Sequence, residues 1–381
     1  MTSNMNLRSL LLSSDERTVR VLRRVLSDLE IDVEHCLSAE NAIRRITRQR
    51  FEAIIVDGSN ADDASRVLVA AKAAPVNKRA LAIVLVEASL GLKGGFELGA
   101  HFVLHKPFAV ERAKASFRAV RALMKRERRI QLRLPVQIPV ACFGNAQYKA
   151  TTIDLCEGGM AIQFIGRFPK ENALRFSLDL PGTQQTLEIQ GEVAWGGNGV
   201  QAGVRFTDPS DDQRNVLRRW LSSQLSEPDQ DDPPVVSNLS DLSAGGCYLT
   251  TNSPFPRGTR VLLSAKTAQG DVRAGAIVLV AHPEFGMGVE FLRATTEQAE
   301  KAQRIVSILQ VNEHKHPEVL VTPDGLEPPT AEDSLATLQT ASTGNSGSTD
   351  ALVDLFRQQF QVPVEAFLQT MKEQRQALDS R

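Results

Sequence analysis

Apolar residues in the first hundred positions follow two alternating patterns. Short uninterrupted apolar runs are typical of strands that are buried on both faces. Such runs occur at 10–12, 54–56, 81–86 and 102–104, with a weaker one at 31–36. An amphipathic helix between the first runs is predicted by the spacing of Leu22, Val25, Leu26 and Leu29. Alternating strands and helices predict a doubly wound, flavodoxin-like α/β domain over residues 6–125.

Beyond residue 126 the pattern changes to short β segments that Gly and Pro separate. This texture predicts an antiparallel β-barrel over residues 126–225, closed by a helix from Asp211 to Leu225. The acidic, Pro-rich stretch Ser226–Pro234 is predicted to be a linker. A second β-rich domain over residues 233–310 repeats the motifs of the first, so we expect two β-barrels in a multi-domain chain.

The C-terminal part has two different compositions. Residues 311–350 are rich in Pro, Ser, Thr and Gly and are predicted to be a disordered linker. Residues 351–378 carry apolar side chains at helical spacing with a break at Pro363, which predicts two short amphipathic helices. Because these apolar faces need burial, we expect the tail to dock a protein partner or to form a homodimer.

Composition excludes several functional classes. The chain has 381 residues with 44 basic and 45 acidic side chains, so we expect no nucleic-acid partner. Cys and His show no metal-binding spacing, and no apolar run approaches the length of a membrane span. No nucleophile–base pair or phosphate loop is evident either. We therefore expect a cytoplasmic protein that is not an enzyme and has no resident cofactor or metal.

The first domain resembles the receiver domain of two-component response regulators. Asp57 ends the third strand, and Lys106 follows the fifth in H-K-P-F. The resemblance implies an Asp that accepts a phosphoryl group, a Mg²⁺ held by an acidic pair, and a Lys that contacts the phosphoryl oxygens. Here Ser13 and Ser14 replace the acidic pair, with Asp15 one position late.

This departure favours one of two interpretations of the Asp57 pocket. Neutral hydroxyl groups are poor ligands for a hard divalent cation, so we do not expect Mg²⁺. The favoured interpretation is a pseudo-receiver in which Asp57 and Lys106 form a structural salt bridge. The alternative is a phosphorylatable switch, which requires Asp15 or Glu16 to reach the pocket.

The β-barrel segment resembles the PilZ domain, a small barrel that binds the bacterial second messenger cyclic di-GMP. The family signatures are R-x-x-x-R before the barrel and D/N-x-S-x-x-G on an early strand and its turn. Arg129 and Arg133 match the first signature, preceded by Arg128, and Asp154 and Gly159 match the second. Cys156 stands where Ser is usual.

The chemistry of these residues agrees with the resemblance. A guanidinium can pair with guanine O6 and N7, clamp a phosphate or stack on a base. Asp154 can accept hydrogen bonds from guanine, and Gly159 allows a close backbone approach to the ring. Cys156 is a weaker hydrogen-bond partner than Ser. We thus predict a cyclic di-GMP site with these members: Arg128, Arg129, Arg133, Asp154, Cys156 and Gly159.

The second repeat has the opposite mismatch. Asp241, Ser243 and Gly246 complete D-x-S-x-x-G, but the acidic stretch upstream supplies no R-x-x-x-R. An acidic approach repels an anionic ligand. We expect a degenerate PilZ repeat that serves packing, dimerisation or partner contact.

Together these patterns predict a bacterial signalling effector. It binds cyclic di-GMP at the first PilZ domain and relays binding to a protein partner by rearranging its domains. Two alternatives remain: a response regulator switched by phosphorylation of Asp57, and an interaction scaffold without either input.

Overall fold

The computed structural model divides the chain into two compact units, Met1–Glu127 with Asp232–Arg381, and Arg128–Asp231. Each unit is described by itself. The structure describes residues 6–87, 91–166, 169, 171–196, 200–207, 209–224, 232–267, 270–283, 285–311, 317–326, 350–358 and 364–379. Among these residues, no helix combines the length and the apolar character that a membrane crossing requires.

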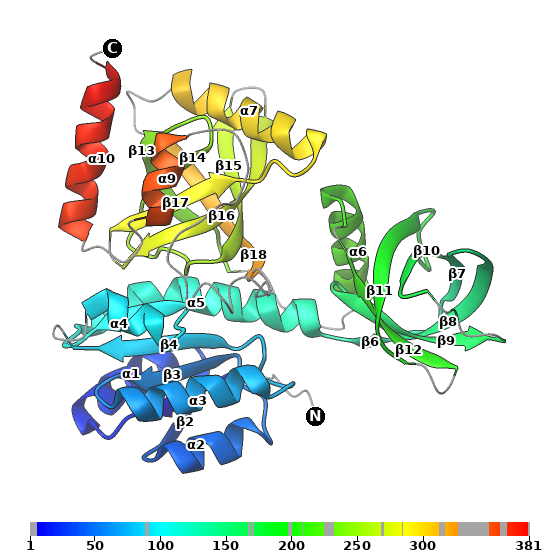
Figure 1. The fold of residues 1–381 in the computed structure, drawn as a ribbon, viewed down its shortest axis with the longest axis horizontal. Coiled ribbons are helices and arrows are strands. Elements are labelled where there is room, and N and C mark those ends of the chain that lie inside the picture. The colour runs from blue at the N-terminus through cyan, green and yellow to red at the C-terminus, as the bar shows by residue number, and fades with distance from the viewer. Residues whose placement is uncertain are drawn as a thin grey trace. The chain divides into compact units, whose positions relative to one another are not determined.

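The N-terminal domain has the predicted doubly wound fold (Figure 1). Its parallel sheet has the order β2-β1-β3-β4-β5, formed by β1 (Leu7–Leu12), β2 (Ile31–Cys36), β3 (Ala53–Asp57), β4 (Leu81–Val86) and β5 (Phe102–His105). The helices are α1 (Glu16–Asp28), α2 (Ala39–Ile46), α3 (Ala61–Ala73), α4 (Gly91–Glu97) and α5 (Val110–Gln131). Every residue of β4 is buried, because helices cover both faces of the sheet.

The first barrel follows α5 and is closed by the pairing of β8 with both β7 and β9. Its strands are β6 (Leu134–Pro135), β7 (Pro139–Phe143), β8 (Gln147–Cys156), β9 (Gly159–Ile165), β10 (Ala173–Asp179), β11 (Thr186–Gly196) and β12 (Gln201–Phe206). The helix α6 (Asp211–Gln224) packs Leu217, Trp220 and Leu221 against the barrel core, as its amphipathic pattern predicts. Trp220 satisfies its indole N–H by donating to the carbonyl of Pro181.

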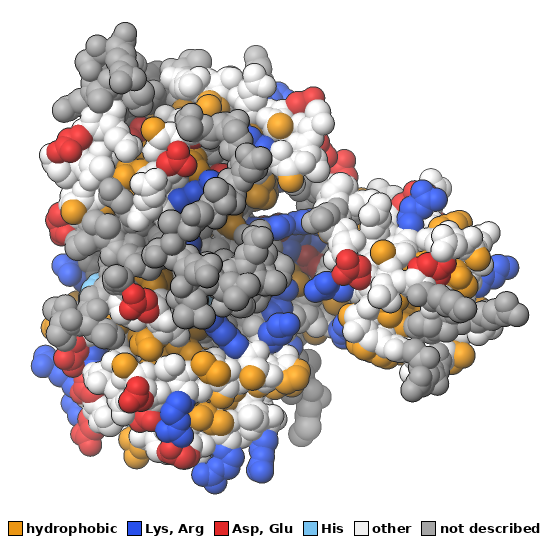
Figure 2. Space-filling model, in the orientation of Figure 1, with side chains coloured by type: hydrophobic (Ala, Val, Ile, Leu, Met, Phe, Trp, Pro, Cys, Tyr) orange, Lys and Arg blue, Asp and Glu red, His pale blue; other side chains and the backbone are white. Residues whose placement is uncertain are grey.

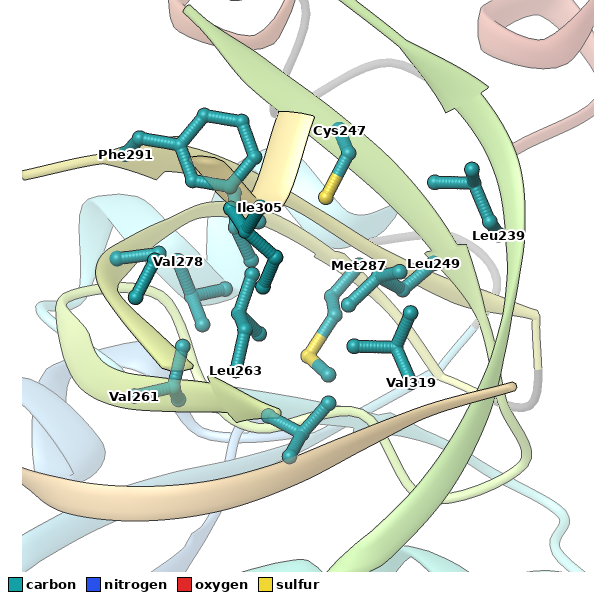
Figure 3. Close-up of a cluster of buried hydrophobic side chains, with 14 of the residues drawn as sticks. Leu239, Cys247, Leu249, Val261, Leu263, Val278, Met287, Phe291, Ile305 and Val319 are labelled. Carbon is teal, nitrogen blue, oxygen red and sulfur yellow. The ribbon is translucent and has the colours of Figure 1, made fainter. Parts of the chain in front are cut away.

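The second barrel is a closed antiparallel ring in the order β13-β14-β17-β16-β15-β18. It comprises β13 (Val235–Leu242), β14 (Gly246–Thr250), β15 (Thr259–Thr267), β16 (Gly270–His282), β17 (Gly286–Phe291), the helix α7 (Thr296–Val311) and β18 (Glu318–Leu326). Leu249, Met287 and Val319 point into one buried cluster from three different strands (Figure 3).

One strand of the second barrel comes from the other end of the sequence. In the first barrel, β7 lies between β8 and β10 and precedes both in the chain. In the second barrel, β18 takes the same place between β13 and β15 but follows all the other strands. The two barrels therefore share a ring of strands and differ by a circular permutation of one strand.

The permuted strand corrects a sequence prediction. Residues 311–350 are predicted to be disordered, and this is wrong for residues 317–326, which include β18. The alternate residues Val319 and Val321 are fully buried, because β18 fills the gap between β13 and β15. Residues 327–349 of the predicted linker lie outside the described residues, as do residues 225–231 of the predicted acidic linker.

The predicted amphipathic tail forms the two helices α9 (Ala351–Gln358) and α10 (Val364–Asp379). Their apolar residues pack on the outer surface of the second barrel. Phe356 and Phe367 are fully buried there against Tyr248, and Pro363 lies outside the described residues. The tail helices thus find their burial within the same chain.

The helix α5 packs between the receiver-like sheet and the second barrel inside the larger unit. Phe117, Val120 and Leu123 belong to the core on the sheet side, whereas Ala119 and Ala122 join the core of the second barrel. Charge pairs reinforce this packing, since Asp232 accepts hydrogen bonds from both Arg121 and Lys125. The basic helix thus neutralises the last carboxylate of the acidic stretch. Both signs of charge are interspersed on the surface of the receiver-like domain (Figure 2).

Candidate functional site

The receiver-like pocket brings Asp57 and Lys106 together. The Lys106 ammonium lies 2.9 Å from the Asp57 carboxylate, and both side chains are about nine-tenths buried. The hydroxyl groups of Ser13 and Ser59 each donate to the same carboxylate at 2.8 Å. Burial acts to raise the pKa of Asp57, but the hydrogen bonds from Lys106, Ser13 and Ser59 outweigh it and hold this pKa below its ordinary value. The salt bridge of the favoured interpretation is therefore present.

The donor groups around Asp57 do not fit a Mg²⁺ site. Asp15 caps the N-terminus of α1, where its carboxylate accepts from the backbone N–H of Arg17 and the hydroxyl of Thr18. Ser13 spends its hydroxyl proton on Asp57 and contributes no charge. Glu87, just after β4, lies 3.6 Å from Lys106 and accepts from Ser59. Since hard cations need several free oxygen ligands, the helix cap removes Asp15 from this role.

The predicted cationic segment straddles the end of α5. Arg128 and Arg129 lie in the last turn of this helix, so residues up to Gln131 are helical and only Arg133 lies in the extended segment before the barrel. Arg133 donates to Asp154 at 2.6 Å. Leu134 and Pro135 then pair with Leu155 and Asp154 as the short strand β6. The R-x-x-x-R and D-x-C-x-x-G motifs therefore meet through Arg133 and Asp154.

The Cys156–Gly159 turn has structural reasons for its residue types. A Cβ on Gly159 would lie 2.1 Å from the carbonyl oxygen of Val204, so only glycine lets β9 and β12 pair closely here. The glycine is thus required by strand packing, and not only by ligand approach as the sequence suggests. Burial raises the pKa of the Cys156 thiol, against the smaller opposing effects of Arg133 and of the backbone N–H groups of Gly158 and Gly159. The thiol interacts with the turn itself.

A row of residues crosses the outer face of the first barrel, from the half-buried Asp154 through the buried Ala161 and Gly203 to the exposed Trp195. Asp154 pairs with Ala161, Ala161 with Gly203, and Gly203 with Trp195, so the row crosses β8, β9, β12 and β11 in turn. Three strand spacings separate Asp154 from Trp195, which is roughly 14 Å. The indole lies over Gly203, because a Cβ there would meet its Nε1 at 1.9 Å, and Trp195 is 53% exposed. We call the outer surface of the barrel that these four residues cross, together with the side chains beside them, the open face.

Sequence motifs alone missed Trp195 and a further cation on the open face. Arg205 lies two residues after Gly203 on β12, opposite Gly159, and pairs with Glu192 at 2.9 Å. The available signal was the period of two in G-V-R-F, which places Gly203 and Arg205 on one face. Trp195 gives no such signal, because a β-bulge between Val193 and Trp195 shifts its register. On the side of the first barrel that Figure 2 shows, hydrophobic and charged side chains lie side by side.

The PilZ domain family model matches residues 125–223 and, a second time, residues 225–307. The chain carries two PilZ domains. They follow a receiver-like domain, and PilZ is a family of cyclic di-GMP receptors. The second match ends before β18, the strand that completes the second barrel.

Three solved structures illustrate these likenesses, each covering less than a third of this chain. The receiver domain of a sensor histidine kinase from Pseudomonas aeruginosa is 22% identical over 29% of this chain and 92% of that chain, with a TM-score of 0.27. The PilZ domain of CeSA from a cellulose-synthesizing bacterium is 22% identical over 23% and 93%, with a TM-score of 0.20. A response regulator from Thermotoga maritima is 14% identical over 31% and 99%, with a TM-score of 0.27. No curated protein matches the chain.

The second PilZ domain keeps the same turn but not the same surroundings. Ser243 accepts from the backbone N–H of Gly246 at 3.1 Å, and a Cβ on Gly246 would lie 2.2 Å from the carbonyl oxygen of Val289. Asp241 accepts from the N–H of its own neighbour, Leu242. The complete D-x-S-x-x-G motif thus builds a closed turn here.

Proposed function

We propose that this chain is a non-enzymatic cytoplasmic signalling effector that binds cyclic di-GMP at its first PilZ domain. One observation carries the proposal. The Arg133–Asp154 ion pair and the exposed Trp195 lie at opposite ends of the same open face. That face offers cations, a carboxylate and an aromatic ring over roughly 14 Å of barrel surface.

The ligand chemistry matches these groups one by one. Arg133 presents its guanidinium to phosphate oxygens or to guanine O6 and N7, as Arg128 and Arg129 also do when α5 unwinds at its end. Asp154 accepts from guanine N–H donors and orients Arg133 before the ligand arrives. Trp195 supplies a stacking surface for a purine, an interaction that does not depend on a particular hydrogen-bond pattern.

The continuity of α5 supports a relay of nucleotide binding to a partner. This helix begins in the receiver-like domain at Val110 and ends in the cationic segment at Gln131. A nucleotide that draws Arg128 and Arg129 onto the barrel changes the helical turn that carries them. The change reorients the receiver-like domain against the first PilZ domain, which alters the surface offered to a protein partner. In this mechanism the receiver-like domain acts without phosphorylation.

Calorimetric titration of the full chain with cyclic di-GMP tests the proposal. We expect micromolar or tighter binding by the wild type. Arg133→Ala removes charge-assisted hydrogen bonds of about 1.5–3 kcal/mol, which weakens binding tenfold to a hundredfold. As a control, Asp241→Asn changes the counterpart of Asp154 in the second PilZ domain and leaves the affinity unchanged. Absence of binding heat in the wild type, with a native circular dichroism spectrum, would overturn the proposal.

Hydrogen exchange tests the relay separately. We expect the amides of residues 118–135 to change their exchange rates on nucleotide addition, because the end of α5 is remodelled. Identical rates with and without bound nucleotide would remove the relay and leave the binding site standing. Labelling of Asp57 by a small phosphodonor in the presence of Mg²⁺ would instead support the phosphorylation alternative.

A further inference from the structure

The two PilZ domains have corresponding outer faces that can be matched residue by residue. In the first barrel the row runs Asp154, Ala161, Gly203 and Trp195. In the second barrel the same ladder positions are Asp241, Tyr248, Gly288 and Val280. A β-bulge precedes the first and the last member of the row in both barrels. The second row is therefore the counterpart of the open face.

The helix α9 lies against β14, β16 and β17 of this second face, whereas Asp241 on β13 lines a cavity beside α10. The Asp350 carboxylate accepts the backbone N–H of Gly245 at 2.6 Å, beside the D-x-S-x-x-G turn. Val353 lies over Gly246, where a Cβ would be 3.2 Å from its methyl group. The ring of Phe356 lies over Gly288 at 2.9 Å from a Cβ placed there. Gly288 is the counterpart of Gly203. Phe356 thus takes the place over Gly288 that Trp195 takes over Gly203 in the first barrel.

Two further features make this surface specific for a helix. Tyr248 replaces the small Ala161 and packs its ring against Phe356 and Phe367, with centroid distances of 6.3 and 5.6 Å. Glu290 replaces Arg205 and binds Arg357 of α9 at 2.6 Å. We call Gly245, Tyr248, Gly288 and Glu290 the helix-binding face. It carries the aromatic ring of Tyr248, and the backbone N–H of Gly245 lies close to the position of Glu290, because Gly246 pairs with Glu290.

One charge on this face disfavours an anionic nucleotide. Glu290 is acidic where the first barrel has Arg205. In addition, the segment that leads into the permuted strand β18 is the one before Glu318, late in the chain. An anionic dinucleotide meets a carboxylate at Glu290, where the first barrel offers the guanidinium of Arg205.

We propose that the second PilZ domain is a helix receptor, closed in cis by α9, whose protein partner presents a competing amphipathic helix. The partner helix has an acidic N-cap residue, a branched apolar residue three positions later, an aromatic residue after three more, and then a basic residue. This is the pattern of Asp350, Val353, Phe356 and Arg357. The inference rests on the proposed effector function, because it identifies the class of partner to which the chain relays.

The covalent connection of α9 to the barrel makes it an internal competitor of a partner helix. Residues 327–349 connect β18 to Asp350 along the chain, so α9 is covalently tethered to the barrel that it contacts. Tethering makes the binding of α9 intramolecular and favours it over the binding of a free helix. A partner helix therefore competes only when it binds more tightly than α9 or when α9 is weakened. A cavity of about 280 Å³ lies between the barrel and α10, lined by Asp241, Tyr248, Met371 and Lys372.

A labelled synthetic peptide of residues 348–379 is the probe, added to the full chain and followed by fluorescence anisotropy. Phe356→Asp in the protein releases α9 and leaves the helix-binding face intact. We expect the peptide to bind this variant at least tenfold more tightly than it binds the wild type. Ala366→Asp adds the same charge at an exposed position of α10 and gives wild-type binding. A peptide that itself carries Phe356→Asp binds neither protein.

A charge exchange makes the test specific for the face. Glu290→Lys, added to the Phe356→Asp protein, weakens binding of the peptide two- to fivefold. Arg357→Glu in the peptide restores binding, as expected for an exposed ion pair. If Phe356→Asp prevents folding, Asp350→Ala replaces it, because this change removes the carboxylate that accepts from the N–H groups of Gly245 and Val353 and leaves the core side chains in place. Equal peptide affinity for wild-type and released proteins would overturn the proposal, as would failure of the charge exchange.

Other occupants give distinct outcomes. A wild-type dimer that the peptide dissociates in sedimentation experiments would assign the face to a second copy of the chain, against the proposal. Displacement of the peptide by cyclic di-GMP would show a nucleotide site and also overturn it. Titration of the same proteins with cyclic di-GMP reports on the first PilZ domain, so the helix receptor can fail while nucleotide binding holds, and the reverse.

Discussion

The two PilZ domains share one ring of strands and one turn, yet their corresponding outer faces are occupied differently. The first presents Trp195 and Arg133 on an open face, whereas the second is covered by α9 of the same chain. The D-x-S-x-x-G motif is complete only in the covered domain. The comparison teaches that this motif shapes the turn between two strands, and that the residues around the turn decide what the face binds.

The glycine of the turn gives the largest expected effect, and it is the same in both domains. Gly159→Ala places a Cβ 2.1 Å from the carbonyl oxygen of Val204, and Gly246→Ala places one 2.2 Å from that of Val289. Because the strands must separate, we expect each change to cost more than about 3 kcal/mol of unfolding free energy. Both tryptophans lie in the first barrel, so their fluorescence follows that domain alone.

Tryptophan fluorescence distinguishes the effects of the two glycine variants. Gly159→Ala shifts the fluorescence-detected urea midpoint strongly, and Gly246→Ala shifts only the transition seen by circular dichroism. Gly158→Ala is the matched control, since its nearest contact is Ile130 at 3.7 Å, and it costs less than about 0.5 kcal/mol. A stable Gly159→Ala protein that lost only nucleotide binding would show that the glycine serves the ligand.

A buried histidine gives the second barrel a pH dependence that the first barrel lacks. Burial lowers the pKa of His282 to about 4 from its ordinary 6.5, and its Nδ1 contacts the hydroxyl of Tyr248. The unfolded chain therefore binds a proton near pH 6.5 that the folded chain binds only near pH 4. Stability is full above pH 6.5 and falls as the pH drops toward 4, by about 2 kcal/mol between pH 7 and pH 5.

Urea unfolding at these two pH values measures the effect of His282. His101 in the receiver-like domain is also buried with a pKa of about 4, so the wild type is compared with His282→Gln. We expect the variant to lose about 2 kcal/mol less than the wild type on acidification. Residues 128–231 contain no histidine, and the fluorescence transition of the first barrel should move little. Equal losses in both proteins would contradict the prediction.

Trp195 tests whether the open face is a stacking surface. Trp195→Ala removes an exposed ring from the Gly203 position and should weaken cyclic di-GMP about tenfold, since base stacking contributes about 1–3 kcal/mol. Phe285→Ala removes a similarly exposed ring from the second barrel and serves as the control. We expect calorimetry to show no change for Phe285→Ala. Wild-type affinity in Trp195→Ala would confine the ligand to the Arg133 end of the face.

The sequence predicted what depends on local pattern. Alternating runs gave the receiver-like sheet, and the repeated D-x-x-x-G-G stretches gave the two barrels. The strand β18 was missed because Pro323, Asp324 and Gly325 are typical of loops. They belong to a strand here because β18 pairs with both β13 and β15 and so closes the barrel. The cover on the second barrel was missed because Asp350 and Gly245 are 105 positions apart. Such contacts depend on tertiary packing that no motif records.

Cys156 gives the smallest expected effect and isolates the role of the motif itself. Ser243, at the same position of the second turn, exchanges hydrogen bonds with the backbone N–H and carbonyl of Gly246. Cys156 is 4% exposed and meets the corresponding backbone groups with a thiol. Cys156→Ser should therefore stabilise the first barrel slightly and change cyclic di-GMP affinity less than threefold, because the substituted atom faces the turn. Calorimetry and the fluorescence-detected urea midpoint measure both quantities. A tenfold gain in affinity without a change in stability would mean that this side chain reaches the nucleotide, and the two turns would then differ in function as well as in sequence.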